Sequence, residues 1–452
     1  MINKFKYIIA VIVTLSLSGC VKKWLDEKPD GSLAVPATIE DFRAMLDEPV
    51  TALTNSCTLC EFASDQDTIT EAGWASHERS TSGNAYTWVE RTPYNAIGDY
   101  TLAYKVIFTL NVALDGLEKM DGADMEVRLL KGRAYFNRGR LFAELAQMFA
   151  PPYSKESLNS EYGIPLRVNA NVNEPTKRST LGQTYERIIS DIKSSAELLP
   201  NNTAFIQIPT KHAAWGYLAR VYLIEQKFDS ALHYAKAYLK EKSSLLDFNT
   251  LSQSAQFINP NIEMASASFC SGAPVSRLEV PKALYDQYEE NDLRKYIFFK
   301  VGGAGNISFS GSYALRRTDT YTGISTDEMY LIAGECLARS GKVPEALKYL
   351  NDLSRSRYRK TEGGESTYMN RSTNDPNVAL TWILKEREKQ LLRRGVRWSD
   401  LRRLNTEGKF KKILTRSIAG QNYVLEPNSE KYTFPIPREV ILNASIKQNP
   451  GW

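Results

Sequence analysis

The feature that most constrains this chain is an apolar periodicity of three to four residues, which is the period of an α-helix. Between positions 126 and 149 the residues that would form one buried helix face are Val127, Leu130, Ala134, Leu141, Leu145 and Phe149. Pro151 and Pro152 end this helix. The same period recurs at 185–199, 211–239, 327–353 and 380–404, and no comparable series of alternating strands appears. The sequence therefore predicts a fold that is mainly all-α.

Two of the helical segments repeat the spacing of their small residues. Ala219 and Ala231 lie twelve positions apart, and Gly334 and Ala346 repeat that interval with Gly341 supplying a turn between them. A small residue in each helix of an antiparallel pair lets the two helices approach closely, which is typical of tetratricopeptide repeats. We therefore expect a tetratricopeptide-like helical repeat scaffold.

The connections between the helices are unusually long, and long connections in compact domains are usually functional or disordered. The segment at about 243–326 contains many aromatic residues, which argue against disorder. We expect a single domain over 20–452, with the repeats mainly within 100–240 and 327–404. The loop-rich subregion would form packed excursions that carry the ligand face.

The N-terminus has the order of a secretory signal. Lys4 and Lys6 precede an apolar run at 7–17, which is too short to span a bilayer, and Leu17-Ser18-Gly19-Cys20 follows. This resembles a bacterial lipoprotein lipobox. We expect residues 1–19 to be removed and Cys20 to carry the lipid, since several acyl chains anchor a protein stably.

Charge and cysteine content exclude several classes of function. The chain has 57 basic and 52 acidic residues, so its excess of positive charge is too shallow to indicate nucleic-acid binding. Cys57 and Cys60 form a lone C-x-x-C, for which a disulfide and two free thiols both remain open. No metal-ligand spacing is evident, so we expect no metal and no cofactor.

The motifs along the chain resemble the SusD/RagB family, the surface nutrient-capture lipoproteins of Gram-negative outer membranes. The N-terminal half contributes Gly132-Arg133-Ala134-Tyr135 and the spacing of Tyr185, Ile188 and Asp191. The C-terminal end is the most specific part, with Gly395-Val396-Arg397-Trp398-Ser399-Asp400-Leu401, then Phe434-Pro435-Ile436-Pro437, then Gln448-Asn449-Pro450-Gly451-Trp452.

Two departures from the family pattern carry expectations. Gln390 and Arg394 stand where the family usually has acids, so ion pairs there with Arg397 or Arg403 must be rearranged or absent. An acidic run close behind the lipid cysteine is associated with export to the outer face, whereas here 21–23 is Val-Lys-Lys. We still expect an outer-membrane lipoprotein that faces the cell surface.

The resemblance implies a protein that binds a nutrient oligomer, most often an oligosaccharide, and passes it to a partner TonB-dependent outer-membrane transporter. A peptide-binding member of the family is the first alternative. A sugar ring presents an apolar face to aromatic side chains while its hydroxyls need polar partners. The candidate ligand-binding residues are Trp74, Arg79, Tyr86, Trp88 and Tyr94 before the first long helix, with Tyr313 and Arg316 from the late loop.

A helical glycoside hydrolase is the alternative from another class. It would need two carboxyl groups across a cleft, and Glu78, Glu90 and Asp99 are available. No catalytic motif accompanies them, so we expect no enzyme activity. A third alternative is a scaffold that binds only proteins. The basic cluster at 393–403 is interrupted by Asp400 and preceded by Glu386 and Glu388, so we expect a structural role for it.

Overall fold

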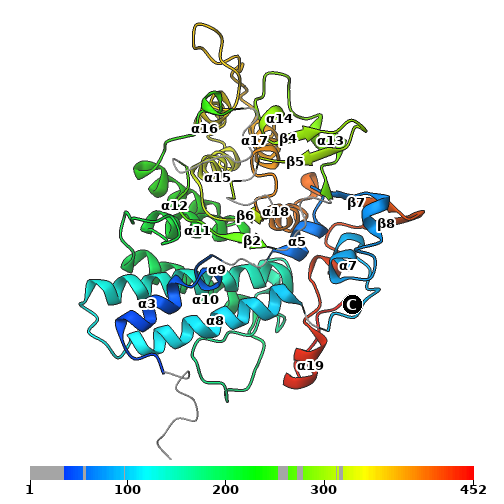
Figure 1. Ribbon diagram of the computed structural model, residues 1–452. Helices are drawn as coiled ribbons and strands as arrows, with labels where there is room; N and C mark the ends of the chain where they lie inside the picture. The colour runs from blue at the N-terminus through cyan, green and yellow to red at the C-terminus, as the bar shows by residue number, and fades with distance from the viewer. Residues whose placement is uncertain are drawn as a thin grey trace, which may run out of the picture.

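The computed structural model describes residues 35–53, 57–95, 97–252, 263–271, 278–311, 313–314 and 319–452. Long helices dominate these residues and pack against one another in chain order (Figure 1). The first group comprises α8 (Gly98–Leu117), α9 (Met125–Phe149), α10 (Leu181–Leu198), α11 (Lys211–Ile224) and α12 (Phe228–Glu241). The second group comprises α15 (Thr326–Arg339), α16 (Val343–Arg355) and α17 (Pro376–Gln390), and it continues the first because α12 packs against α15. The predicted helical repeat scaffold is confirmed.

Local sequence signals define where these helices begin. The Asp124 carboxylate accepts hydrogen bonds from the amides of Glu126 and Val127 at the start of α9. Thr180 and Gln183 form a reciprocal capping box at the start of α10. Side-chain oxygens at these positions satisfy backbone amides that have no partner within the helix.

Small residues allow the helices to approach closely, as their spacing predicts. A Cβ added at Gly334 in α15 would lie 3.5 Å from the carbonyl oxygen of Ala346 in α16. Ala219 and Ala231 are both fully buried between their neighbours. At Gly139 an added Cβ would come within 2.8 Å of Ile192 Cδ1, so α9 and α10 pack too closely there for a larger residue.

The described parts of the segment between α12 and α15 contain only short elements. They are the 3-10 helix η2 (Phe248–Thr250), β2 (Phe269–Ser271), β3 (Leu278–Glu279), α13 (Lys282–Tyr285), α14 (Arg294–Ile297), β4 (Phe299–Val301), β5 (Ile307–Phe309) and β6 (Asp319–Tyr321). Their aromatic side chains form a second hydrophobic cluster, in which the ring centroids of Tyr288 and Phe299 lie 4.9 Å apart. This cluster gives the loop-rich segment a packed interior of its own.

The N-terminal helices α3 (Ile39–Asp47) and α4 (Pro49–Leu53) pack against α8. The next N-terminal elements meet the C-terminal elements on one side of the helical array, and they are α5 (Thr58–Ala63), β1 (Thr68–Ile69), α6 (Glu71–Trp74) and α7 (Thr81–Thr87). The C-terminal elements are α18 (Arg397–Leu404), β7 (Leu414–Ile418), β8 (Gln421–Leu425) and α19 (Arg438–Ala444). Strands β7 and β8 form an antiparallel hairpin beside α7, at the right of Figure 1.

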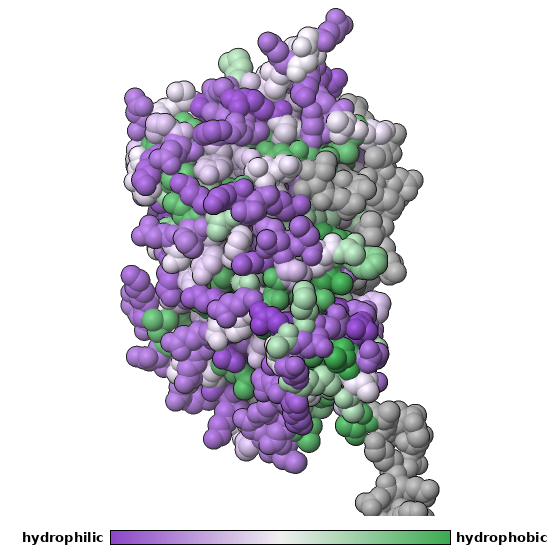
Figure 2. Space-filling view, turned by 90° about the vertical axis from the view of Figure 1, so that its left-hand side faces the viewer, coloured by the Kyte–Doolittle hydropathy of each residue, from purple (hydrophilic) through white to green (hydrophobic). Residues whose placement is uncertain are grey.

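The sheets in the described residues are antiparallel pairs: β1 with β3, β2 with β6, β4 with β5, and β7 with β8. The turn of the last hairpin places Ala419 and Gly420 at positive φ, which matches the right-handed twist of the strands. The side of the molecule away from this hairpin, at the left of Figure 1, presents mainly hydrophilic side chains (Figure 2). Among the residues described, none of the helices combines the length and the apolar character needed to cross a bilayer.

Candidate functional site

The predicted ligand-binding stretch folds into short helices whose starts are specified locally. The hydroxyl of Thr70 accepts from the amide of Gly73 at the start of α6, and Ser80 does the same for Gly83 at the start of α7. Trp88 ends α7 in a left-handed conformation with φ of 57°. These turns direct the aromatic side chains of the stretch toward the hairpin β7–β8.

The rings of Trp74, Tyr86 and Trp88 pack inside the protein, with exposed fractions of 4%, 2% and 3%. The guanidinium carbon of Arg416, in β7, lies 3.7 Å from the ring centroid of Tyr86 and 5.1 Å from that of Trp88. Arg416 also donates hydrogen bonds to the backbone carbonyls of Phe62, Ser64 and Asp67. The three rings therefore attach the N-terminal helices to the C-terminal hairpin.

These rings, which are among the predicted ligand-binding residues, are not presented outward. Their sequence neighbours are polar and contain glycine, but Arg416 and the rest of the hairpin cover the rings from a distant part of the chain. Tyr94 is covered in the same way by Trp452, whose ring meets it edge-on at 5.4 Å. Contact of these residues with a ligand stays a prediction, and it would require access to faces that now pack against protein.

Accessible groups nevertheless lie next to the buried rings. Arg79, one of the predicted ligand-binding residues, is exposed. The Arg91 guanidinium carbon lies 5.5 Å from the ring centroid of Trp74 and 5.0 Å from that of Tyr423, in β8, and Arg91 and Tyr423 are both half-buried. Tyr423 escaped the sequence reasoning because nothing in its local pattern connects it to Trp74.

Tyr313 belongs to a buried polar network and not to a surface. Its hydroxyl donates to Glu263 at 3.0 Å, and the Arg394 guanidinium carbon lies 4.3 Å from its ring centroid. Glu263 in turn pairs with Arg357 at 2.7 Å. Such fully paired networks hold segments in one arrangement, so Tyr313 attaches the late loop to the helical core. Arg316, Cys20 as the predicted lipid-attachment residue, and the predicted signal peptide at 1–19 lie outside the described residues.

The basic cluster has the structural role predicted for it. Arg403 pairs with Glu335 at 2.6 Å and with Asp400 at 2.8 Å, and Arg397 pairs with Asp65 at 2.6 Å. The departures at Gln390 and Arg394 are accommodated by rearrangement. Gln390 accepts hydrogen bonds from Arg294 and Arg357 and donates one to Asp327. Arg394 also pairs with Asp327.

The described cysteines are buried free thiols, so no disulfide joins Cys57 to Cys60. Burial raises the pKa of both thiols well above the ordinary value, which keeps them protonated and unreactive. Both side chains line a small central cavity of about 40 Å³ together with Tyr217 and Arg220. Over the ranges described, the His, Cys, Asp and Glu side chains form no group of three or more that could hold a metal ion.

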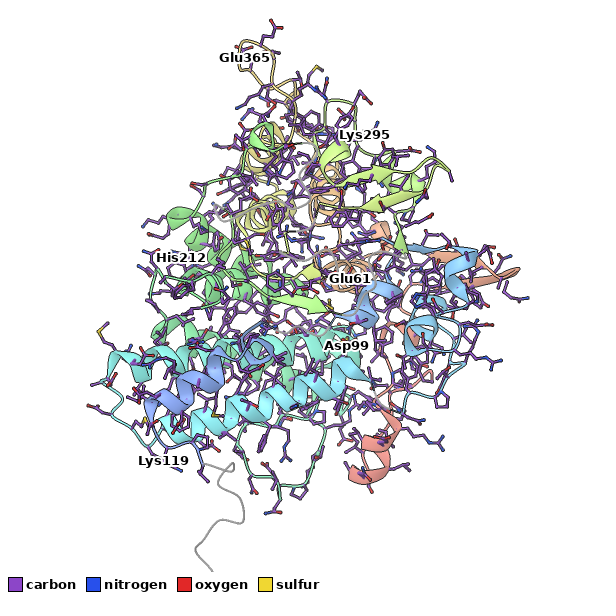
Figure 3. The ribbon with its side chains drawn as sticks, viewed as in Figure 1. Glu61, Asp99, Lys119, His212, Lys295 and Glu365 are labelled. Atoms are coloured by element: carbon purple, nitrogen blue, oxygen red, sulfur yellow. The ribbon has the colours of Figure 1, made fainter. Side chains whose placement is uncertain are left out.

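The carboxyl groups near the predicted ligand stretch have structural roles or face solvent. Asp99, at the start of α8, accepts from the amides of Thr58 and Leu59 at 3.3 and 3.0 Å and so caps α5. Figure 3 shows Asp99 and Glu61 near the centre of the molecule, where α5 meets α8. Glu78 and Glu90 are exposed.

A second hollow, with a volume of about 530 Å³, lies elsewhere, between α10 and the connection that precedes it. Its polar lining includes Arg167, Lys177, Arg178 and Arg187. None of the predicted ligand-binding residues lines it. The sequence signal that marks it is only a run of basic residues around a proline, which is common in surface loops.

Comparison with known families gives two matches along the chain. Residues 23–223 match a family described as "Starch-binding associating with outer membrane", and residues 317–452 match the SusD family. A relative named SusD-like protein P2, from Formosa agariphila, is 25% identical over 142 residues. That alignment covers 31% of this chain and only 26% of the relative's length.

Solved structures share the whole fold. A putative sugar binding protein from Bacteroides vulgatus superposes with a TM-score of 0.73 at 20% identity, covering 93% of this chain and 100% of that one. A SusD superfamily protein from Bacteroides thetaiotaomicron gives 0.70 at 20% identity, with coverage of 92% and 100%. A laminarin binding SusD-like protein gives 0.65 at 18% identity, again with coverage of 92% and 100%.

Proposed function

Because this chain belongs to the SusD family, we propose that it binds an oligosaccharide at the outer surface of a Gram-negative outer membrane and passes it to a TonB-dependent transporter. The observation that carries the proposal is the pair of family matches, which together extend from residue 23 to the C-terminus with one interruption. The laminarin-binding neighbour supports a carbohydrate in preference to a peptide.

The proposed mode of attachment is a lipid on Cys20. The residues at 17–20 are suited to lipoprotein processing. A lipid anchor holds a protein close to the membrane and raises its local concentration at a membrane partner. Replacing Cys20 by Ser should release the protein from the membrane fraction, while the same substitution at Cys336 should leave it there.

We place the glycan on the surface formed by Arg91 and Tyr423. Tyr423 offers a half-buried ring that Arg91 orients on one side, and guanidinium groups hydrogen-bond sugar hydroxyls. The buried rings of Trp74 and Tyr86 then support this surface from below. The protein binds its ligand without transforming it.

A glycan array probed with the lipid-free mature chain tests this function. We expect binding to β-glucan or starch oligosaccharides and no release of new reducing ends. Tyr423→Ala should weaken binding by about 5-fold, since one aromatic contact is worth roughly 1 kcal/mol. Val424→Ala, on the same strand and 55% exposed, is the matched control and should bind like the wild type.

Three results would contradict the proposal. Retention of peptides alone on a parallel peptide array would favour the peptide-binding alternative. New reducing ends would favour a glycoside hydrolase. Full glycan affinity in Tyr423→Ala would contradict the proposed location of the glycan at Tyr423 but not glycan binding itself.

A further inference from the structure

The hollow beside α10 contains charge that the proposed glycan surface does not use. We call it the α10 hollow and define it by its charged lining residues, which are Arg167, Glu174, Lys177, Arg178, Glu186 and Arg187. Its volume of about 530 Å³ lies within the usual range for small-molecule sites, about 300–1,000 Å³. Four of these six side chains are basic.

One wall of the α10 hollow is held firmly by α8. The connection between α9 and α10 runs along that helix and forms the loop beneath it in Figure 1. The Tyr104 hydroxyl donates to the carbonyl of Pro165 at 2.8 Å, and the Asn111 amide donates to that of Arg167 at 2.9 Å. The Asp115 carboxylate accepts from the amide of Ala170 at 2.9 Å. The wall is therefore preorganised, which lowers the entropic cost of binding a ligand.

Three of the four cations of the hollow have no carboxylate partner in the described part of the chain. Arg178 donates to the carbonyls of Phe149, Tyr162, Gly163 and Lys447 and to the side-chain oxygen of Asn449. Arg167 donates only to the carbonyls of Asn171 and Glu174, both at 2.6 Å. Lys177 is exposed and has no ion-pair partner within the described part of the chain.

Several buried arginines elsewhere in the protein face acids, as Arg403 does with Glu335 and Asp400. In the hollow, Arg187 is the one lining cation with a described carboxylate partner, Asp191 at 3.4 Å. Asp191 already accepts two hydrogen bonds from Arg138. The lining thus carries four cations against two carboxylates, which leaves a net charge of +2.

The two acids of the lining do not cancel this charge. Glu174 accepts from the side-chain amide of Asn169 at 3.0 Å, and Glu186 lies exposed on α10. Burial without an acidic partner lowers the pKa of Arg178 to about 10. An anion in the hollow would favour the charged guanidinium and reverse that effect.

We propose that the α10 hollow binds the oxyanion of an acidic saccharide, a sulfate, phosphate or carboxylate group, at Lys177, Arg167 and Arg187. Gln183 and Ser190 add an amide and a hydroxyl to the lining, which suit sugar hydroxyls. The saccharide part of this proposal rests on the proposed function, whereas the oxyanion part does not. The hollow lies apart from the surface around Tyr423, so the two sites are separable by mutation.

Isothermal titration calorimetry at low salt tests the oxyanion site with three ligands: galactose 6-sulfate, sodium sulfate and galactose. We expect heat of binding for galactose 6-sulfate, none for galactose at this site, and competition by sulfate but not by chloride at equal ionic strength. Lys177→Gln should weaken binding by about 5-fold, the usual upper range for one exposed charge pair. Lys177→Glu should abolish it.

Lys385→Gln is the matched control, because Lys385 is also exposed and has no ion-pair partner among the described residues. Equal affinity in wild type and Lys177→Gln, or equal competition by sulfate and chloride, would overturn the proposal. Sulfate binding as tight as that of galactose 6-sulfate would support an oxyanion site and refute recognition of the saccharide. Failure on the neutral glycan array, with sulfate binding intact, would refute the proposed function alone.

Discussion

Glu61 makes the stability of this protein depend on pH in an unusual direction. It lies in α5, is only 4% exposed, and accepts a hydrogen bond from the amide of Gly395 at 3.0 Å (Figure 3). Burial, and next the nearby carboxylate of Asp67, raise its pKa from 4.5 to about 8, although the Arg393 guanidinium opposes them. The folded protein therefore holds this proton more tightly than the unfolded chain does.

The sign and size of the effect follow from linkage. A group whose pKa is raised on folding stabilises the fold fully below its unfolded pKa and loses that contribution as the pH rises through its folded pKa. At about 1.4 kcal/mol per pKa unit, the interval from 4.5 to about 8 corresponds to about 5 kcal/mol, of which about 3 is already lost at pH 7.

Glu61→Gln tests this reasoning, because an amide still accepts the Gly395 hydrogen bond but never ionises. The free energy of unfolding, measured by urea denaturation with Trp fluorescence, should match that of the wild type near pH 4. It should exceed the wild type by about 3 kcal/mol at pH 7 and by about 5 at pH 9. Glu78→Gln, an exposed matched control, should show no such trend. A Glu61→Gln difference that stays constant between pH 4 and 9 would refute a protonated Glu61.

The remaining predictions concern buried charges and thiols. Arg416→Met should lower the free energy of unfolding by about 3 kcal/mol in urea denaturation, because three buried carbonyls lose their donor. Arg403→Met should cost about 3–5 kcal/mol, since it leaves two buried carboxylates with one partner fewer. The Lys282 side chain is 78% exposed although it pairs with Asp286. Lys282→Ala should therefore lower the free energy of unfolding by less than about 1 kcal/mol in the same assay. The Cys57 and Cys60 thiols should react with DTNB at pH 8 only after unfolding, and rapid labelling of the native protein would contradict their burial.

Much of the helical scaffold was predictable because its signals are local. The apolar period at 126–149 corresponds to α9 at Met125–Phe149, and the period at 185–199 corresponds to α10 at Leu181–Leu198. The continuous period at 211–239 is divided into α11 and α12 around Gln226, whose φ of 56° breaks the helix. Periodicity reports which face is buried, but it does not report where a single residue reverses the chain.

The candidate site was less predictable because its contacts are long-range. Composition around Trp74 and Trp88 suggested exposed rings, yet the hairpin that contains Arg416 covers them. Tyr423, which lies in that hairpin, is the ring that remains partly accessible. The α10 hollow was missed for a related reason, since its charge is visible only when each cation's partners are known.

The sequence by itself determined the helices, the close approach of Gly334 to Ala346 and the family, because periodicity, small-residue spacing and terminal motifs are properties of neighbouring positions. Only the tertiary structure decided which aromatic rings are covered, which arginines are neutralised and which cations are left to face a hollow. Many of those outcomes depend on contacts between residues far apart in the sequence, and the burial and pairing of a side chain are set by whatever segment the fold brings against it.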